Sequence, residues 1–151
     1  MPQSLANILL HIVFSTKDRT QWMTDQKINK DLYAYMATIL ANIDSPAILI
    51  NGVDDHVHIL CNLSRTLSVM KLVEKVKTEP SKWMKKQGAQ YRDFYWQNGY
   101  GAFSVSESKS EEVRRYIGDQ QEHHKKLKFK PEFRTLCRKN RLKIDERHVW
   151  E

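Results

Sequence analysis

The sequence has little of what marks secreted or membrane-spanning proteins. It contains only two cysteines, Cys61 and Cys137, which could form one disulfide at most; this favours a reducing compartment with two free thiols. The longest apolar stretch, residues 8–14, is interrupted by His11 and falls far short of the roughly 20 residues needed to cross a bilayer. The first residues do not show the basic start, apolar run and small-residue cleavage site that are typical of a signal peptide. We therefore expect a cytoplasmic protein with no membrane segment.

Glycine and proline are also scarce, with five and four residues, whereas 40% of the chain is hydrophobic and 28% is charged. Such a composition excludes a low-complexity or disordered chain and provides enough apolar surface for a core. No repeat or Gly/Ser-rich linker divides the 151 residues. The sequence therefore predicts one domain over residues 1–151.

The net charge of +7 is concentrated in the second half of the chain. Residues 1–67 hold 5 basic and 6 acidic side chains, whereas residues 109–151 hold 13 and 8. Within the basic C-terminal segment 125–151, the stretch Lys125–Lys143 carries nine Lys or Arg residues against the lone Glu132. Such a segment is suited to a polyanion such as a phosphate backbone. A solvated tail explains the charge equally well.

The apolar patterns predict alternating strands and helices. In chain order these are a strand at residues 8–14, a helix capped by Thr24 or Asp25 and ended by Ser45-Pro46, a hairpin of 47–51 and 56–62, a helix from Ser68 that breaks near Pro80, a strand at 101–106, and a helix from Ser108 to about Lys126. This order favours an α+β ferredoxin-like sandwich, with an antiparallel sheet and helices on one face.

Two histidines on the second hairpin strand are the first candidate site. Side chains alternate along a strand, so His56 and His58 point to one face together with Leu60. Two neighbouring imidazoles are a natural pair of metal ligands. The pattern is unspecific, because ordinary half-exposed strand residues also produce it.

A tyrosine and a glutamine on the last predicted helix complete the candidate set. Tyr116 and Gln120 are four residues apart and share a face with Val113 and Ile117, which we expect to point toward the sheet and the histidines. Considered without the histidines, Tyr116 is better explained as a core aromatic whose hydroxyl is satisfied by Gln120.

Together the four residues fit a phosphoryl-transfer mechanism. Two imidazoles and the oxygen of Gln120 would leave open positions on a divalent cation, which can hold and polarise a scissile phosphate. The phenol of Tyr116 would attack that phosphate. Covalent attack conserves the energy of the phosphodiester bond, so a strand could be cut and rejoined without ATP.

Three ordered segments resemble a known family. The motifs are residues 51–58, ending in His56-Val57-His58, then residues 96–106, and residues 116–120 followed by His123-His124. They resemble insertion-sequence transposases of the single-tyrosine HUH (His-hydrophobe-His) type, including REP-associated tyrosine transposases, over essentially the whole chain. The resemblance implies an enzyme that nicks single-stranded DNA beside hairpin ends and forms a 5′-phosphotyrosine link.

The same resemblance implies roles, cofactor and assembly. It makes Tyr116 the nucleophile and His56, His58 and Gln120 the ligands of Mg²⁺ or Mn²⁺. It also implies a homodimer in which the tyrosine helix of one subunit completes the active site of the other.

Basic and histidine side chains outside the motifs are candidate DNA contacts. The expected contacts are Lys71, Lys75, Lys82, Lys86, Arg114, Arg115, His123, His124, Lys125 and Lys126. Two other functions remain open: a non-catalytic module that binds single-stranded nucleic acid on the same fold, and a hydrolytic nuclease that uses water in place of tyrosine.

Overall fold

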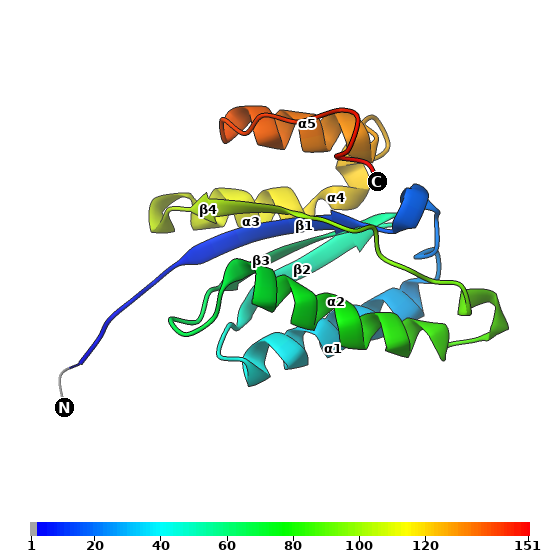
Figure 1. Cartoon of the computed structure of the whole chain (residues 1–151), viewed down its shortest axis with the longest axis horizontal. Helices are drawn as coiled ribbons and strands as arrows, with labels where there is room; N and C mark the ends of the chain where they lie inside the picture. Colours follow the sequence, from blue (N-terminus) through cyan, green and yellow to red (C-terminus); the bar gives the residue numbers. More distant parts are fainter. Residues whose placement is uncertain (1–2) are drawn as a thin grey trace.

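A four-stranded antiparallel sheet is the centre of the fold in the computed structural model, which describes residues 3–151 (Figure 1). Its strands are β1 (Leu9–Ser15), β2 (Ala47–Val53), β3 (His56–Asn62) and β4 (Gly101–Val105). The helices are α1 (Gln26–Asn42), α2 (Val69–Lys85), α3 (Ser110–Gly118), α4 (Gln120–His123) and α5 (Phe129–Lys139). Short 3₁₀ turns lie at Lys17–Arg19, Ala89–Tyr91 and Glu107–Lys109.

The strand order confirms the ferredoxin-like topology expected from the sequence. The strands lie in the order β2-β3-β1-β4, and every neighbouring pair is antiparallel. The two central strands, β1 and β3, pair along their whole length, with Val13 opposite His58 and Ser15 opposite His56. Each strand lies within two residues of its predicted place, because the apolar runs and the turn at Asp54-Asp55 are local signals.

The main core lies between the sheet and the layer formed by α1 and α2 (Figure 1). The strands contribute Leu10, Ile12, Phe14, Val57, Ile59 and Cys61, and the helices contribute residues such as Leu32, Met36, Leu40, Leu72, Val73 and Val76. Because side chains alternate along each strand, the other members of β1 and β3 face away from this core. His11, His56 and His58 are therefore directed to the opposite face.

The opposite face is covered by α3, α4 and α5, a second helical layer that the expected one-sided architecture lacked (Figure 1). A smaller apolar cluster fixes it, in which Val13 and Phe103 of the sheet meet Phe129, Phe133 and Cys137 of α5. These three α5 residues recur every four positions and so form one helical stripe. The basic segment is thus partly a packed helix and not only a solvated tail.

The predicted break at Pro80 is wrong, since α2 runs without interruption from Val69 to Lys85. Ser68 caps this helix by accepting the backbone N–H of Lys71 at 3.1 Å. Pro80 itself is buried on the packed side of the helix, so tertiary burial outweighs its missing N–H. Within residues 3–151, no helix is both long enough and apolar enough to cross a membrane.

The predicted single helix from Ser108 to Lys126 is also wrong, because Asp119 separates α3 from α4. The amide of Asn51 explains the break: its Nδ2 donates to the carbonyl oxygens of Ile117 at 2.9 Å and of Gly118 at 3.3 Å. A side chain of β2 thus satisfies acceptors that a continuing helix would use. The break directs the side chain of Gln120 toward the protein interior, where it is fully buried.

Replacing Gly52 with Ala should destabilise the hairpin that carries the histidines. A Cβ atom at Gly52 would overlap the backbone carbonyl oxygen of His56 and lie 3.0 Å from the hydroxyl of Tyr33. We expect Gly52→Ala to cost about 1–3 kcal/mol in the free energy of unfolding, measured by urea denaturation. Gly118→Ala is the matched control, because the nearest atom to its Cβ would be Leu49 Cδ2 at 3.9 Å. Equal stability of the two variants would contradict this packing.

Candidate active site

Three histidines and one carboxylate meet between the sheet and α5. The Nε2 atoms of His56, His58 and His124 lie 3.2, 3.1 and 3.2 Å from Oε1 of Glu132. His56 and His58 come from β3, His124 follows α4, and Glu132 comes from the first half of α5. Both strand histidines are fully buried, and Glu132 is only 1% exposed. This group could hold a metal ion.

The outer nitrogens of the two strand histidines are fixed by neighbours. Asp55 Oδ1 lies 2.7 Å from Nδ1 of His56, and Nε2 of His11 lies 2.8 Å from Nδ1 of His58. Such contacts orient an imidazole and leave its other nitrogen free to face a ligand. From the sequence, Asp55 can be interpreted as a metal carboxylate, but turn formation is the simpler explanation, and His11 has no predicted role.

Tyr116 reaches the same site from α3. Its hydroxyl donates a hydrogen bond to Oε2 of Glu132. Its ring centroid lies 5.8 Å from that of His58 and 4.8 Å from that of His123. The tyrosine and the histidines that meet here all come from one chain.

Gln120 lies beside the tyrosine and is fully buried. Its Nε2 donates to the carbonyl oxygen of Tyr116 at 3.3 Å, whereas its Oε1 has no hydrogen-bond partner among the described residues. The Nε2 atoms of His56 and His124 also lack one there. Buried polar atoms are almost always partnered. Imidazole nitrogens with amide and carboxylate oxygens suit a divalent cation of the Mn²⁺ kind, so these residues fit the metal that the sequence implied.

Burial and the carboxylate set the charge states of the site. Burial would raise the pKa of Glu132, but the close imidazoles of His124, His56 and His58 hold it well below its usual range. Burial lowers the pKa of His58 to about 4. Burial, followed by the charge of Glu132, raises the pKa of Tyr116. The phenol therefore stays protonated in this arrangement and is a weak nucleophile until its surroundings change.

Glu132 is the central residue of the candidate site, and sequence reasoning assigned it no role. Counted by charge, it is one acid in a basic segment. Its position on the helix carried the signal, because it lies between Phe129 and Phe133 on the stripe that α5 buries. An acid within an apolar helical stripe is rarely buried without partners, and here the partners come from three other elements.

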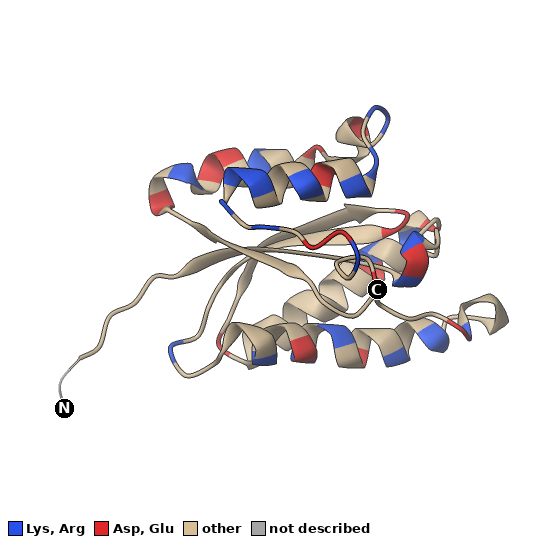
Figure 2. Cartoon of the chain, turned by 45° about the horizontal axis from the view of Figure 1, so that its top comes forward, with Lys and Arg blue, Asp and Glu red and all other residues tan. Residues whose placement is uncertain are grey.

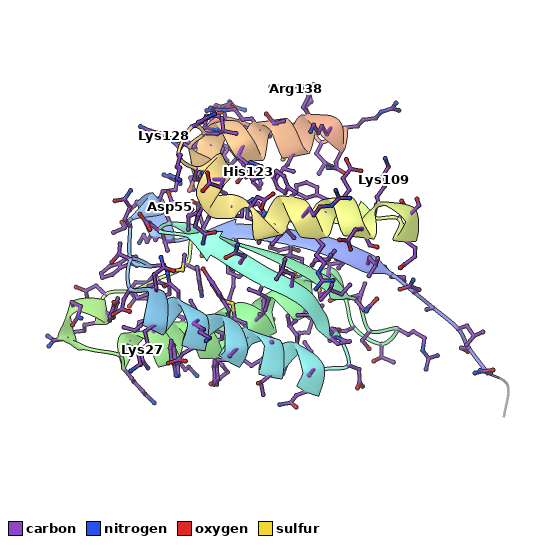
Figure 3. All side chains as sticks on the ribbon, turned by 180° about the vertical axis from the view of Figure 1, so that it is seen from behind. Lys27, Asp55, Lys109, His123, Lys128 and Arg138 are labelled. Carbon is purple, nitrogen blue, oxygen red and sulfur yellow. The ribbon has the colours of Figure 1, made fainter. Side chains whose placement is uncertain are left out.

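The predicted DNA contacts fall into two separate groups. His123 and His124 are half-buried at the site, and Arg114, Arg115, Lys125 and Lys126 are exposed on α3 and on the connection to α5. Figure 3 shows His123, Asp55 and Lys128 at the same end of the molecule. Lys71, Lys75 and Lys82 of α2, and Lys86 directly after it, are exposed on the other side of the sheet. Figure 2 shows Lys and Arg positions along the lower helix, α2.

Residues 4–120 match the family described as "Transposase IS200 like". Because the match spans most of the chain and includes His56, His58, Tyr116 and Gln120, the protein belongs to this family of DNA transposases. This confirms the resemblance drawn from the sequence motifs. Among curated proteins, none matches the chain.

Solved structures of similar fold are also transposases. One is a protein assigned as a transposase of Deinococcus radiodurans R1, with a TM-score of 0.62 and 18% sequence identity, covering 80% of this chain and 95% of that one. Another is the REP-associated tyrosine transposase bound to a REP hairpin, with a TM-score of 0.53 and 10% identity, covering 80% and 68%. At these identities the likeness shows a shared fold.

The buried neutral histidines should make the protein sensitive to acid. Burial, followed by the charge of His58, lowers the pKa of His11 to about 3. Between pH 6.5 and 3 the unfolded chain therefore binds a proton at His11 that the folded chain does not, and stability falls as pH falls. We expect His11→Gln to reduce that slope by up to about 1.4 kcal/mol per pH unit, measured by urea unfolding from pH 7 to 4. Identical slopes in the two proteins would contradict the burial of a neutral His11.

Proposed function

We propose that this protein is a metal-dependent transposase that cuts and rejoins single-stranded DNA through Tyr116. The observation that carries the proposal is that the Tyr116 hydroxyl and the Nε2 atoms of His56 and His58 converge on one carboxylate, that of Glu132. A nucleophile and a set of metal ligands therefore share one small buried site. Membership in a transposase family supports DNA as the substrate.

His56 and His58 would hold the cation, Mg²⁺ or Mn²⁺, with Gln120 Oε1 and His124 Nε2 as the further ligands. Asp55 and His11 would keep the two strand imidazoles in the required orientation. When bound, the cation would withdraw charge from the scissile phosphate and orient it for in-line attack.

Tyr116 would make the covalent link. Its phenolic oxygen forms a bond to phosphorus, its proton is lost to a neighbouring base or water, and the bond from phosphorus to the 3′ oxygen breaks. The products are a 5′-phosphotyrosine and a free 3′ hydroxyl once the leaving oxygen takes up a proton. Attack by a 3′ hydroxyl on the phosphotyrosine reverses the step and rejoins a strand.

Hairpin-ended DNA is the substrate that we propose. The structural neighbour described as bound to a REP hairpin supports this choice. Arg114, Arg115, Lys125 and Lys126 would contact phosphates near Tyr116, with His123 and His124 beside the cleaved link. The α2 lysines would contact a second length of DNA on the far side of the sheet. Two buried free thiols suit work in the reducing cytoplasm.

We also propose that two copies act together, each holding one DNA end. The strands β2 and β4 are the two edges of the sheet, and an edge strand can pair with another copy. Exchange of α3 and α4 between copies would place Tyr116 of one beside the histidines of the other. The cis arrangement seen in the single chain would then be one of two states.

Tyr116→Phe should abolish a covalent protein–DNA product. We expect the unmodified protein, incubated with Mn²⁺ and a single-stranded oligonucleotide that ends in a hairpin, to yield an adduct that survives denaturing electrophoresis. The Phe variant lacks the attacking oxygen and should yield none. Tyr100→Phe is the matched control, because Tyr100 is exposed and lies on the loop before β4.

Two other results of this assay would contradict the tyrosine mechanism. Cleavage without an adduct would indicate the hydrolytic nuclease, and binding without cleavage would indicate the passive module. An adduct that persists in Tyr116→Phe would show that another residue attacks.

His58→Ala should remove Mn²⁺ binding, measured by titration calorimetry without DNA. Loss of a residue that orients a metal ligand without touching the metal typically costs about 10–100-fold in metal affinity. Loss of a direct ligand should cost at least as much. His148→Ala is the control, because His148 is exposed and pairs with Glu151 near the end of the chain. Unchanged affinity in His58→Ala would exclude it as a ligand.

A further inference from the structure

The carboxylate of Glu132 connects the nucleophile to the metal ligands. One oxygen lies within 3.2 Å of the Nε2 atoms of His56, His58 and His124. The other accepts the hydroxyl hydrogen bond of Tyr116. The side chain fills this position completely, since it is only 1% exposed and the two strand histidines are fully buried.

A scissile phosphodiester would need the same position. The proposed reaction requires an anionic oxygen turned toward the histidine ligands and a phosphorus atom within reach of the Tyr116 oxygen. A carboxylate offers the same pattern on a smaller scale, namely one delocalised negative charge over two oxygens. The two anions cannot occupy this one position together, because each would need the same space between the histidine nitrogens and the Tyr116 hydroxyl.

We propose that Glu132 takes the place of the scissile phosphate in the DNA-free protein, and that single-stranded DNA binds beneath α5 by displacing it. This inference rests on the proposed function, because it assigns a substrate position within the same site. In the resting protein the carboxylate would serve as a ligand to the cation, and in the DNA complex a phosphate oxygen would replace it.

Two hollows at the sides of Glu132 mark the path of the strand. One, of about 530 Å³, adjoins His124 and is lined by the basic side chains Arg19, Lys128, Lys130 and Arg134 together with Asp54 and Asp55. The other, of about 610 Å³, adjoins Tyr116 and is more apolar. The first half of α5 lines the former and its second half lines the latter. Glu132 contacts both His124, which lines the first hollow, and Tyr116, which lines the second, so it lies between the two.

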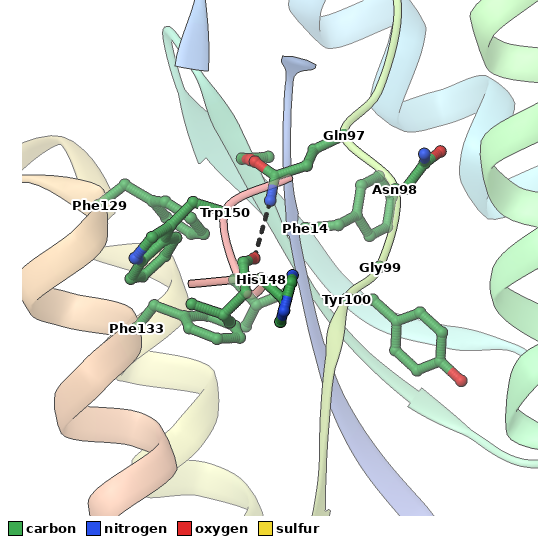
Figure 4. Close-up of a pocket in the computed structure, with 12 residues that line it drawn as sticks. Phe14, Gln97, Asn98, Gly99, Tyr100, Phe129, Phe133, His148 and Trp150 are labelled. Carbon is green, nitrogen blue, oxygen red and sulfur yellow. Dashed lines mark hydrogen bonds between the residues drawn. The ribbon is translucent and has the colours of Figure 1, made fainter. Parts of the chain in front are cut away.

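The attachment of α5 allows it to move as a unit. The residues that connect it to α4, 125–128, are all exposed, and its apolar cluster is separate from the main core. The chain end packs against it: the rings of Trp150 and Phe133 meet edge to face with centroids 5.9 Å apart (Figure 4), and Arg134 pairs with Glu146 at 2.7 Å. Figure 1 shows α5 as the outermost layer over this face.

A binding measurement without chemistry tests the proposal. In EDTA, we expect Glu132→Gln to bind a fluorescent hairpin oligonucleotide with an unpaired tail about tenfold more tightly than the unmodified protein does. The reason is that the apparent affinity is the intrinsic affinity multiplied by the fraction of molecules in which α5 has released the site. Loss of the Glu132 charge should increase that fraction. Glu151→Gln removes an equal charge from an exposed side chain that pairs only with His148 and should change the affinity little. Equal or weaker binding by Glu132→Gln than by Glu151→Gln would overturn the proposal.

Hydrogen exchange gives a second test. It uses the unmodified chain, so misfolding of a variant cannot affect it. At saturating oligonucleotide, the α5 amides, residues 129–139, should lose protection, whereas those of α1, residues 26–42, should not. Protection that is unchanged or increased in α5 would overturn the proposal. Loss of protection in α5 without any Tyr116 adduct would support this inference and contradict the tyrosine mechanism. An adduct formed while α5 stays protected would support the tyrosine mechanism and contradict this inference.

Discussion

The antiparallel pairing of β1 with β3 is the constraint on which the rest of the structure depends. Because side chains alternate, this pairing directs Val57, Ile59 and Cys61 into the main core and His56 and His58 to the other face. A slip of one residue in β3 would bury the histidines in the apolar core and expose its valine and isoleucine. The stability of the sheet and the position of the candidate metal ligands are therefore set by the same register.

The second face is polar at its centre and apolar at its rim, and the two parts depend on each other. Taking a carboxylate and several imidazoles out of water is costly unless each finds a partner. Here Glu132 is the shared partner of three histidines and a tyrosine. The phenylalanines of α5 hold it in place by packing on the sheet. Under the proposal, a DNA phosphate would replace this carboxylate when the site opens.

Much of the candidate site could be predicted from the sequence because its signals are local. Alternation along one strand placed His56 and His58 together, and spacing of four residues placed Tyr116 near Gln120. His11, Asp55 and Glu132 could not be found in this way, since their roles arise only where separate elements pack together. The helix break after Gly118 has the same origin, because the side chain responsible, Asn51, lies on another strand. Charge counting assigned Glu132 to a basic tail, whereas its helical position between two phenylalanines determines its burial.

The membership of the chain in a transposase family and the convergence of its tyrosine and histidines support the proposal that Tyr116 becomes covalently joined to the 5′ phosphate of a cut strand. The most direct test is tandem mass spectrometry of the tryptic peptide that begins at Tyr116, after reaction with a hairpin oligonucleotide and Mn²⁺ and digestion of the bound DNA. We expect a nucleotide remnant on the Tyr116 phenol, together with a released strand that ends in a 3′ hydroxyl. Cleaved DNA accompanied by an unmodified Tyr116 peptide would contradict the claim.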